Sequence, residues 1–134
     1  METTIERIGD GSTAIVGVSG ELDASNFQSL IDVARGLRAA GTSRLVVDMS
    51  DLTYMASSGL VALYSIALIM RGDEPPDPEG GWSAFHAIGT DEGQARGHVK
   101  LLRPQAPVAR ILERTGLTRF FDVYSEKENA LSSF

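Results

Sequence analysis

A strand that runs directly into a helix constrains this chain more than any other feature. The β-branched run Leu45-Val46-Val47 leads into residues 48–60, and a long apolar stripe of helical period follows. Ser57 and Ser58 therefore fall at or just before the start of a helix. Because a helix N-terminus presents unpaired N–H groups and the positive end of a dipole, a hydroxyl there either caps the helix or can hold a phosphate.

Turn and cap signals divide the rest of the chain into strands and helices. Strands are predicted over residues 5–8, 13–19, 44–49 and 98–103, with a hairpin turn at Asp10-Gly11. Helices are predicted from the Ser25/Gln28 capping box to Gly41, over residues 58–71, over residues 107–116, and after the Ser125/Glu128 capping box. Residues 117–124 form a short apolar return that is expected to be extended. The order β-β-α-β-α-β-α predicts an α/β fold with a small mixed β-sheet flanked by α-helices.

Residues 72–97 interrupt this order. They hold three prolines, six glycines, and six acids against one arginine, and about 26 residues exceed an ordinary helix-to-strand connection. We predict one domain over residues 1–134 with a long, acidic, partly disordered inserted loop at 72–97. Trp82 and Phe85 inside it would either pin the loop to the body or contact a partner; a solvated loop is the plainer alternative.

The composition excludes several classes of function. The 12 basic and 18 acidic residues give a net charge of −6, which disfavours nucleic acid or an anionic membrane as a general partner. There is no cysteine, the N-terminus lacks a secretory pattern, and the apolar stretch at residues 60–70 is shorter than the roughly 20 residues that span a bilayer. A soluble cytoplasmic protein is expected.

No residue pattern indicates catalysis. The sequence lacks a nucleophile–base set, a phosphate-binding glycine loop after a strand, and carboxylates or cysteines at ligand spacing from His86 or His98. We therefore expect no enzyme activity, no catalytic residues, no metal and no cofactor.

Two segments resemble a known family when they are taken together. Gly20-Glu-Leu-Asp23 before one helix, and Asp48-Met-Ser-Asp-Leu-Thr-Tyr-Met-Ala-Ser-Ser-Gly-Leu60 before the next, resemble the STAS domain of sulfate transporters and anti-sigma factor antagonists. Residues 115–123 are similar to the C-terminal segment of that family. The resemblance covers about residues 5–71 and 98–125.

The resemblance implies the predicted fold and a regulatory function. Free-standing bacterial members bind anti-sigma factors that are also serine kinases, and phosphorylation of a serine at the start of the second helix releases the partner. That phosphoacceptor corresponds to Ser57, followed by Ser58 and Gly59, and Asp23 corresponds to the acidic residue on the neighbouring loop. These four residues are the predicted partner-binding site, in a monomer or weak homodimer that could also bind other STAS proteins.

One position departs from the family pattern. Ala56 stands where the family usually has an aspartate, immediately before the acceptor serine. Three alternatives stay open: Ser57 or Ser58 is a plain N-cap, the chain is a non-phosphorylated scaffold in a stressosome-like complex, or it is a STAS domain that handles a small ligand or lipid. Asp48 and Asp51 are interpreted mainly as turn and strand-end residues.

Overall fold

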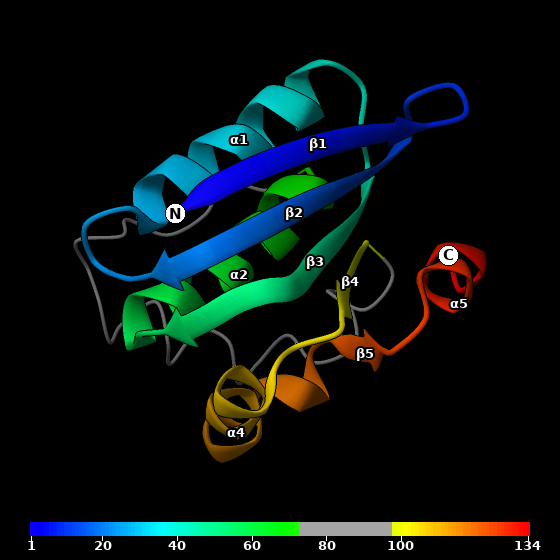
Figure 1. Ribbon diagram of the computed structural model, residues 1–134. Coiled ribbons are helices and arrows are strands. Elements are labelled where there is room, and N and C mark those ends of the chain that lie inside the picture. Colours follow the sequence, from blue (N-terminus) through cyan, green and yellow to red (C-terminus); the bar gives the residue numbers. More distant parts are fainter. Residues whose placement is uncertain (73–97) are drawn as a thin grey trace.

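The computed structural model describes residues 1–72 and 98–134 (Figure 1). Within them, five strands form one sheet in the order β1-β2-β3-β4-β5: Glu2–Ile8, Thr13–Leu22, Arg44–Met55, Val99–Leu102 and Asp122–Tyr124. β1 pairs with β2 in antiparallel fashion, and the other neighbouring strands are parallel. The predicted α/β fold with a small mixed sheet is confirmed.

Helices cover both faces of the sheet. The described helical elements are α1 (Phe27–Ala39), α2 (Ser57–Met70), α4 (Ala106–Thr115), a 3₁₀ turn η3 (Leu117–Arg119) and α5 (Lys127–Ser132). In Figure 1, α1 and α2 lie together behind β1–β3, α4 lies beside β3 and β4, and α5 lies at the far end of the sheet. The face under α1 and α2 is called the inner face below, and the opposite face is called the outer face.

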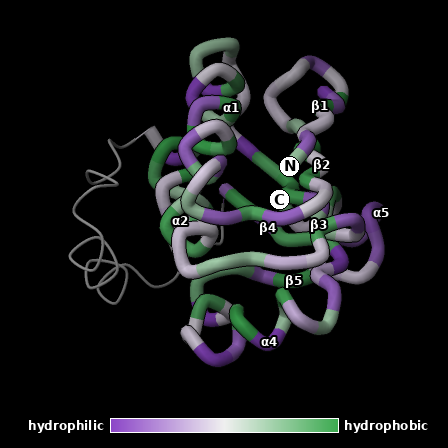
Figure 2. Tube along the Cα trace, turned by 60° about the vertical axis from the view of Figure 1, so that its left-hand side comes forward, coloured by the Kyte–Doolittle hydropathy of each residue, from purple (hydrophilic) through white to green (hydrophobic). Residues whose placement is uncertain are grey.

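The larger apolar core lies between the inner face and the helices. It contains alternate residues of β2 and β3, such as Val16 and Val47, together with the buried side chains of α1, α2 and α4. α2 is apolar along most of its length (Figure 2). All its residues from Gly59 onward are buried. A smaller cluster on the outer face holds Ile15, Val46 and Leu102 beneath Ala130 of α5. Because successive side chains of a strand point to opposite faces, alternate residues of β2 and β3 lie in two different cores.

β3 continues to Met55, so the predicted strand end at residue 49 is wrong. Two register shifts in the β2–β3 pair explain the error, because Met49-Ser50 lies opposite Val18 and Thr53 is an extra residue between two pairs. Such β-bulges break the alternation of apolar and polar residues on which strand prediction depends. β2 likewise continues to Leu22, beyond the predicted end at residue 19.

Both predicted capping boxes are wrong, whereas the predicted glycine stop of α1 is confirmed. The N-cap residues of α1 and α5 are Asn26 and Glu126, and neither helix has a side-chain cap hydrogen bond. After α1, Gly41 adopts φ +103°, its N–H donates to Arg38 O at 3.0 Å, and Thr42 N–H donates to Leu37 O at 2.9 Å. This pair of bonds is a Schellman motif, which a left-handed residue makes possible.

The C-terminal part agrees with the prediction in outline. Pro107 lies in the first turn of α4, and Gly116 follows the helix in a left-handed conformation. The expected apolar return consists of η3 followed by the short strand β5. The inserted loop, with Trp82, Phe85 and His86, lies outside the described residues except for Gly72, so it stays a prediction.

Candidate functional site

The candidate site lies where β2 and β3 end. The two strands are parallel, and their final registered pair is Leu22 with Met55. Beyond that pair, the N–H of Ala56 donates a 2.8 Å hydrogen bond to the carbonyl of Leu22. The loop after β2, which carries Asp23, and the start of α2, which carries Ser57, are therefore neighbours at one edge of the sheet (Figure 1).

Ser57 is the first residue of α2, and its side chain is exposed. The N-cap residue is Ala56, with φ −82° and ψ 173°, so no side chain caps the helix. The alternative in which Ser57 or Ser58 is a plain N-cap is therefore wrong. The first turn of α2 also carries no acidic residue. An exposed hydroxyl thus stands beside backbone N–H groups and a positive dipole end that no carboxylate of the helix offsets.

Ser58 and Gly59 have environments unlike that of Ser57. The Oγ of Ser58 is buried and has no hydrogen-bond partner. Gly59 is buried, and a Cβ at this position would overlap the side chain of Met55 and lie 3.0 Å from Leu22 Cδ2. Of the three predicted residues, Ser57 offers a surface group, whereas Gly59 allows α2 to pack closely on the ends of β2 and β3.

Asp23 organises its own loop. Its Oδ1 accepts hydrogen bonds from the N–H of Ser25 at 2.9 Å and from the hydroxyl of Ser25 at 2.5 Å. The hydroxyl bond and then the N–H bond of Ser25 lower the pKa of Asp23 below its ordinary value, since both bonds favour the charged form. Asp23 is therefore a fixed negative charge near the start of α2 at neutral pH.

Asn26 is a residue of the site that sequence reasoning missed. Its Oδ1 accepts from the N–H of Asp23 at 2.9 Å, and its Nδ2 donates to the carbonyl of Glu21 at 2.9 Å. Because Asn26 joins both sides of the loop, it holds Asp23 in place. An asparagine shortly before an apolar helical stripe is a signal that could have indicated this function.

Metal and membrane expectations can be compared only with the part of the chain that is described. In residues 1–72 and 98–134, no group of three or more histidine, cysteine, aspartate or glutamate side chains could hold a metal ion. His98 Nδ1 lies 3.2 Å from the carbonyl oxygen of Ser43, a distance that fits a hydrogen bond between the imidazole ring and the backbone. Among the same residues, no helix combines the length and apolar character needed to cross a membrane.

A comparison with protein-family profiles shows the family to which the chain belongs. A family profile described as "Mlab, STAS domain" matches residues 7–74, which include β2, α1, β3 and α2 and therefore the whole candidate site. The chain belongs to the STAS domain family. The resemblance that the sequence motifs carried is thus confirmed. No curated protein matches this STAS chain.

Solved structures with the same fold support the assignment. An anti-sigma factor antagonist from Mycobacterium paratuberculosis is 22% identical, with a TM-score of 0.67 over 98% of this chain and 92% of that one. The anti-sigma factor antagonist SpoIIAA in its unphosphorylated form is 16% identical, with a TM-score of 0.65 over 98% and 95% of the two chains. The phosphorylated form of SpoIIAA, a Bacillus cell fate determinant, is also 16% identical, with a TM-score of 0.58 over 98% of each chain. At these identities the likeness shows a shared fold.

Proposed function

We propose that this STAS chain is a cytoplasmic, non-enzymatic regulatory module that acts as an anti-sigma factor antagonist. Its partner would be an anti-sigma factor that is also a serine kinase, and phosphorylation of Ser57 would release that partner. One observation carries the proposal. An exposed hydroxyl stands at the first residue of α2, where no side chain caps the helix and no acid occupies the first turn.

Electrostatics explains how such a switch operates without refolding. A phosphate on Ser57 adds a charge of about −1.5 to −2 and accepts hydrogen bonds from N–H groups at the helix end. The added charge joins that of Asp23 on the adjacent loop, so the edge of the sheet becomes strongly negative. A partner surface that fits the neutral hydroxyl then meets a charge that is costly to desolvate, and it dissociates.

Charge variants of Ser57 test this function. The anti-sigma factor is isolated from the source cells with the purified STAS protein, and its affinity is measured for the wild type, Ser57→Ala and Ser57→Asp. Ser57→Ala should bind like the wild type and resist release by ATP, whereas Ser57→Asp should bind at least about tenfold more weakly. Ser132→Asp adds the same charge to an exposed serine of α5 and serves as the matched control. Equal affinity for Ser57→Asp and Ser132→Asp would contradict the proposal.

A second candidate function rests on Ala56. This N-cap residue has only a methyl group, so the acceptor serine lacks the preceding carboxylate that is usual in the family. A kinase that orients its substrate through that carboxylate would lose a contact, which favours a non-phosphorylated scaffold that assembles with other STAS proteins. Light scattering after size-exclusion chromatography separates the two candidates. A large assembly that contains a second STAS protein and forms without phosphate supports the scaffold, whereas loss of the anti-sigma factor on phosphorylation of Ser57 supports the switch.

A further inference from the structure

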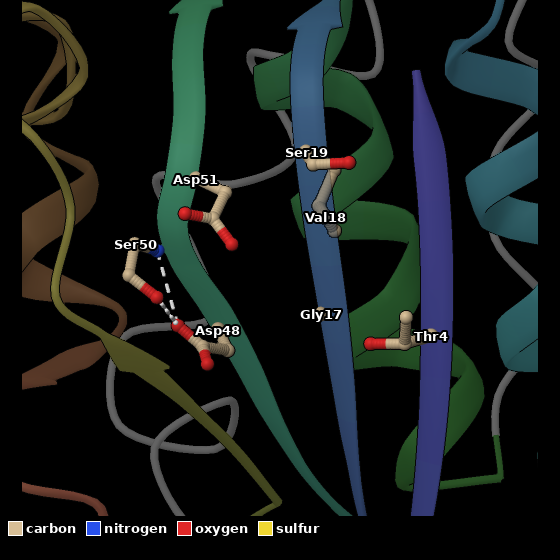
Figure 3. Close-up of a pocket in the computed structure, with 7 residues that line it drawn as sticks. All are labelled: Thr4, Gly17, Val18, Ser19, Asp48, Ser50 and Asp51. Carbon is tan, nitrogen blue, oxygen red and sulfur yellow. Dashed lines mark hydrogen bonds between the residues drawn. The ribbon is translucent and has the colours of Figure 1, made fainter.

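The outer face of the sheet has an open polar half. α5 and its apolar cluster cover the half near Ile15 and Val46, and among the described residues no helix packs on the other half. A pocket of about 110 Å³ lies there across β1, β2 and β3. Figure 3 shows Thr4 on one side of the pocket, Gly17 in the floor, and Asp48 and Asp51 on the other side.

Two backbone features create this pocket. Gly17 leaves the floor open, because a Cβ there would lie 2.5 Å from Thr4 Oγ1. The bulge at Met49-Ser50 turns both Asp48 and Asp51 toward the outer face, three positions apart, instead of sending one of them into the core. The prediction that these aspartates are turn and strand-end residues is therefore wrong, because both lie within β3.

The side chains that line the pocket include two acids and no base. Asp48 Oδ1 accepts from the N–H and the hydroxyl of Ser50, at 3.0 and 2.5 Å. Glu2 lies two residues before Thr4 on β1 and so shares its face. No lysine or arginine lines the pocket, and in the described residues the salt bridges are Lys100–Asp122 and Lys127–Glu6, which involve none of these carboxylates.

A complementary basic surface lies on the same chain. Arg110 and Arg114 are exposed and one helical turn apart, on the side of α4 opposite its buried residues Val108 and Leu112. Arg119 of the next element, η3, is also exposed, and Glu113 is the exposed acid of α4. In the described part of the chain, none of these three arginines forms a salt bridge. We call Arg110 and Arg114 the arginine face.

We propose that the arginine face of one copy docks on the acidic outer sheet face of another copy, with a guanidinium group in the pocket. A guanidinium presents five N–H donors that match carboxylate and hydroxyl acceptors. The two surfaces differ, so the contact is heterologous and can link more than two copies. Because neither surface contains Ser57, this self-association is independent of the proposed phosphorylation switch.

Charge reversal with complementation tests the proposal. Sedimentation velocity of the full chain at ~50 mM salt should show reversible association that weakens at ~500 mM salt, since exposed charges are screened. Asp48→Lys with Asp51→Lys should be monomeric, as should Arg110→Glu with Arg114→Glu, each associating about tenfold or more weakly than the wild type. An equimolar mixture of the two variants should associate again, because each supplies the partner charge that the other lacks.

Two further variants keep the result interpretable. Since Asp48 holds the bulge through Ser50, Glu2→Lys with Asp51→Lys reverses the face without changing that bond, and it should also be monomeric. Glu126→Lys with Glu128→Lys makes the same charge change at exposed positions near α5 and should associate like the wild type. A wild-type protein that stays monomeric at low salt would overturn the proposal. Face variants that associate like the wild type, or a mixture that stays monomeric, would also overturn it.

Discussion

The N–H of Ala56 donates a 2.8 Å hydrogen bond to the carbonyl of Leu22, and this bond joins the two loops of the candidate site. Leu22 ends β2 and precedes Asp23, whereas Ala56 ends the β3–α2 junction and precedes Ser57. The acidic loop and Ser57 are therefore held by the backbone of a parallel strand pair. The ends of two paired strands thus set the position of Ser57.

Close packing at Gly59 should make this glycine sensitive to substitution. We expect Gly59→Ala to lower the free energy of unfolding by about 1–3 kcal/mol, because the new methyl group overlaps Met55 and presses on Leu22. Gly36→Ala is the matched control, since a Cβ on this α1 residue has no atom within 4 Å. It should raise stability by about 0.5–1 kcal/mol. Chemical denaturation measures both, and equal effects would contradict the packing described for Gly59.

The uncapped start of α2 predicts that a carboxylate at residue 56 stabilises the protein. Ala56 already has the extended backbone of an N-cap residue, so Ala56→Asp should raise the free energy of unfolding by about 1 kcal/mol. Ala24→Asp adds the same charge to an exposed loop residue that caps no helix. Thermal and urea unfolding should show a higher free energy of unfolding for Ala56→Asp than for Ala24→Asp. An unchanged free energy of unfolding for Ala56→Asp would argue against an uncapped helix end.

The pKa of Asp23 should depend on Ser25. We expect the Asp23 carboxyl to titrate below its ordinary value of 3.8 in the wild type and closer to that value in Ser25→Ala. Because the folded-state pKa is lowered, the stabilisation is complete above the unfolded value and is lost as pH falls through the folded value. Carboxyl NMR titration measures the pKa. Asp10, whose pKa the N–H and hydroxyl of Ser12 lower, is the internal control and should not change.

In the ion pair between β4 and β5 only the lysine is buried, since the Asp122 side chain is 39% exposed, so the two residues should respond differently to substitution. Lys100 Nζ lies 3.1 Å from Asp122 Oδ2, and the lysine side chain is 6% exposed. Asp122→Asn should cost about 1–3 kcal/mol because it leaves a buried ammonium group without its carboxylate. Lys100→Met removes the buried charge and should change stability by less than about 1 kcal/mol.

An exposed ion pair provides the reference for this comparison. Lys127 and Glu6 lie 3.1 Å apart with side chains 44% and 56% exposed, so Glu6→Gln should cost no more than about 0.5 kcal/mol. Urea unfolding ranks the three variants. A cost for Asp122→Asn as small as that for Glu6→Gln would show that burial of Lys100 adds nothing to the contribution of its ion pair.

Local patterns in the sequence predict most of the fold. The apolar period of α1 and α2, the glycine after α1 and the proline in the first turn of α4 act within a few residues, and each prediction agrees with the structure. The ends of β2 and β3 could not be predicted in this way. The bulges depend on how Met49, Ser50 and Thr53 pair with β2. The alternation of apolar and polar residues along β3 alone does not reveal that pairing.

Like the fold, the candidate site could be predicted only where it depends on residues that are close together in the sequence. The position of Ser57 at the start of α2 follows from one strand–helix junction, so the sequence was sufficient. The burial of Ser58 Oγ and the packing of Gly59 on Leu22 involve a second strand, and the support of Asp23 by Asn26 requires a folded loop. The failure of the Ser25 capping box has a physical cause, because Asp23 binds the Ser25 hydroxyl that would have capped α1.

Phosphorylation-site mapping of the protein isolated from its native cells tests the central claim most directly. Mass spectrometry of the intact chain and of its peptides should find one phosphate, and fragmentation should place that phosphate on Ser57. Ser57→Ala expressed in the same cells should carry none. A phosphate confined to another residue, or a Ser57→Ala protein that is phosphorylated as fully as the wild type, would contradict the account.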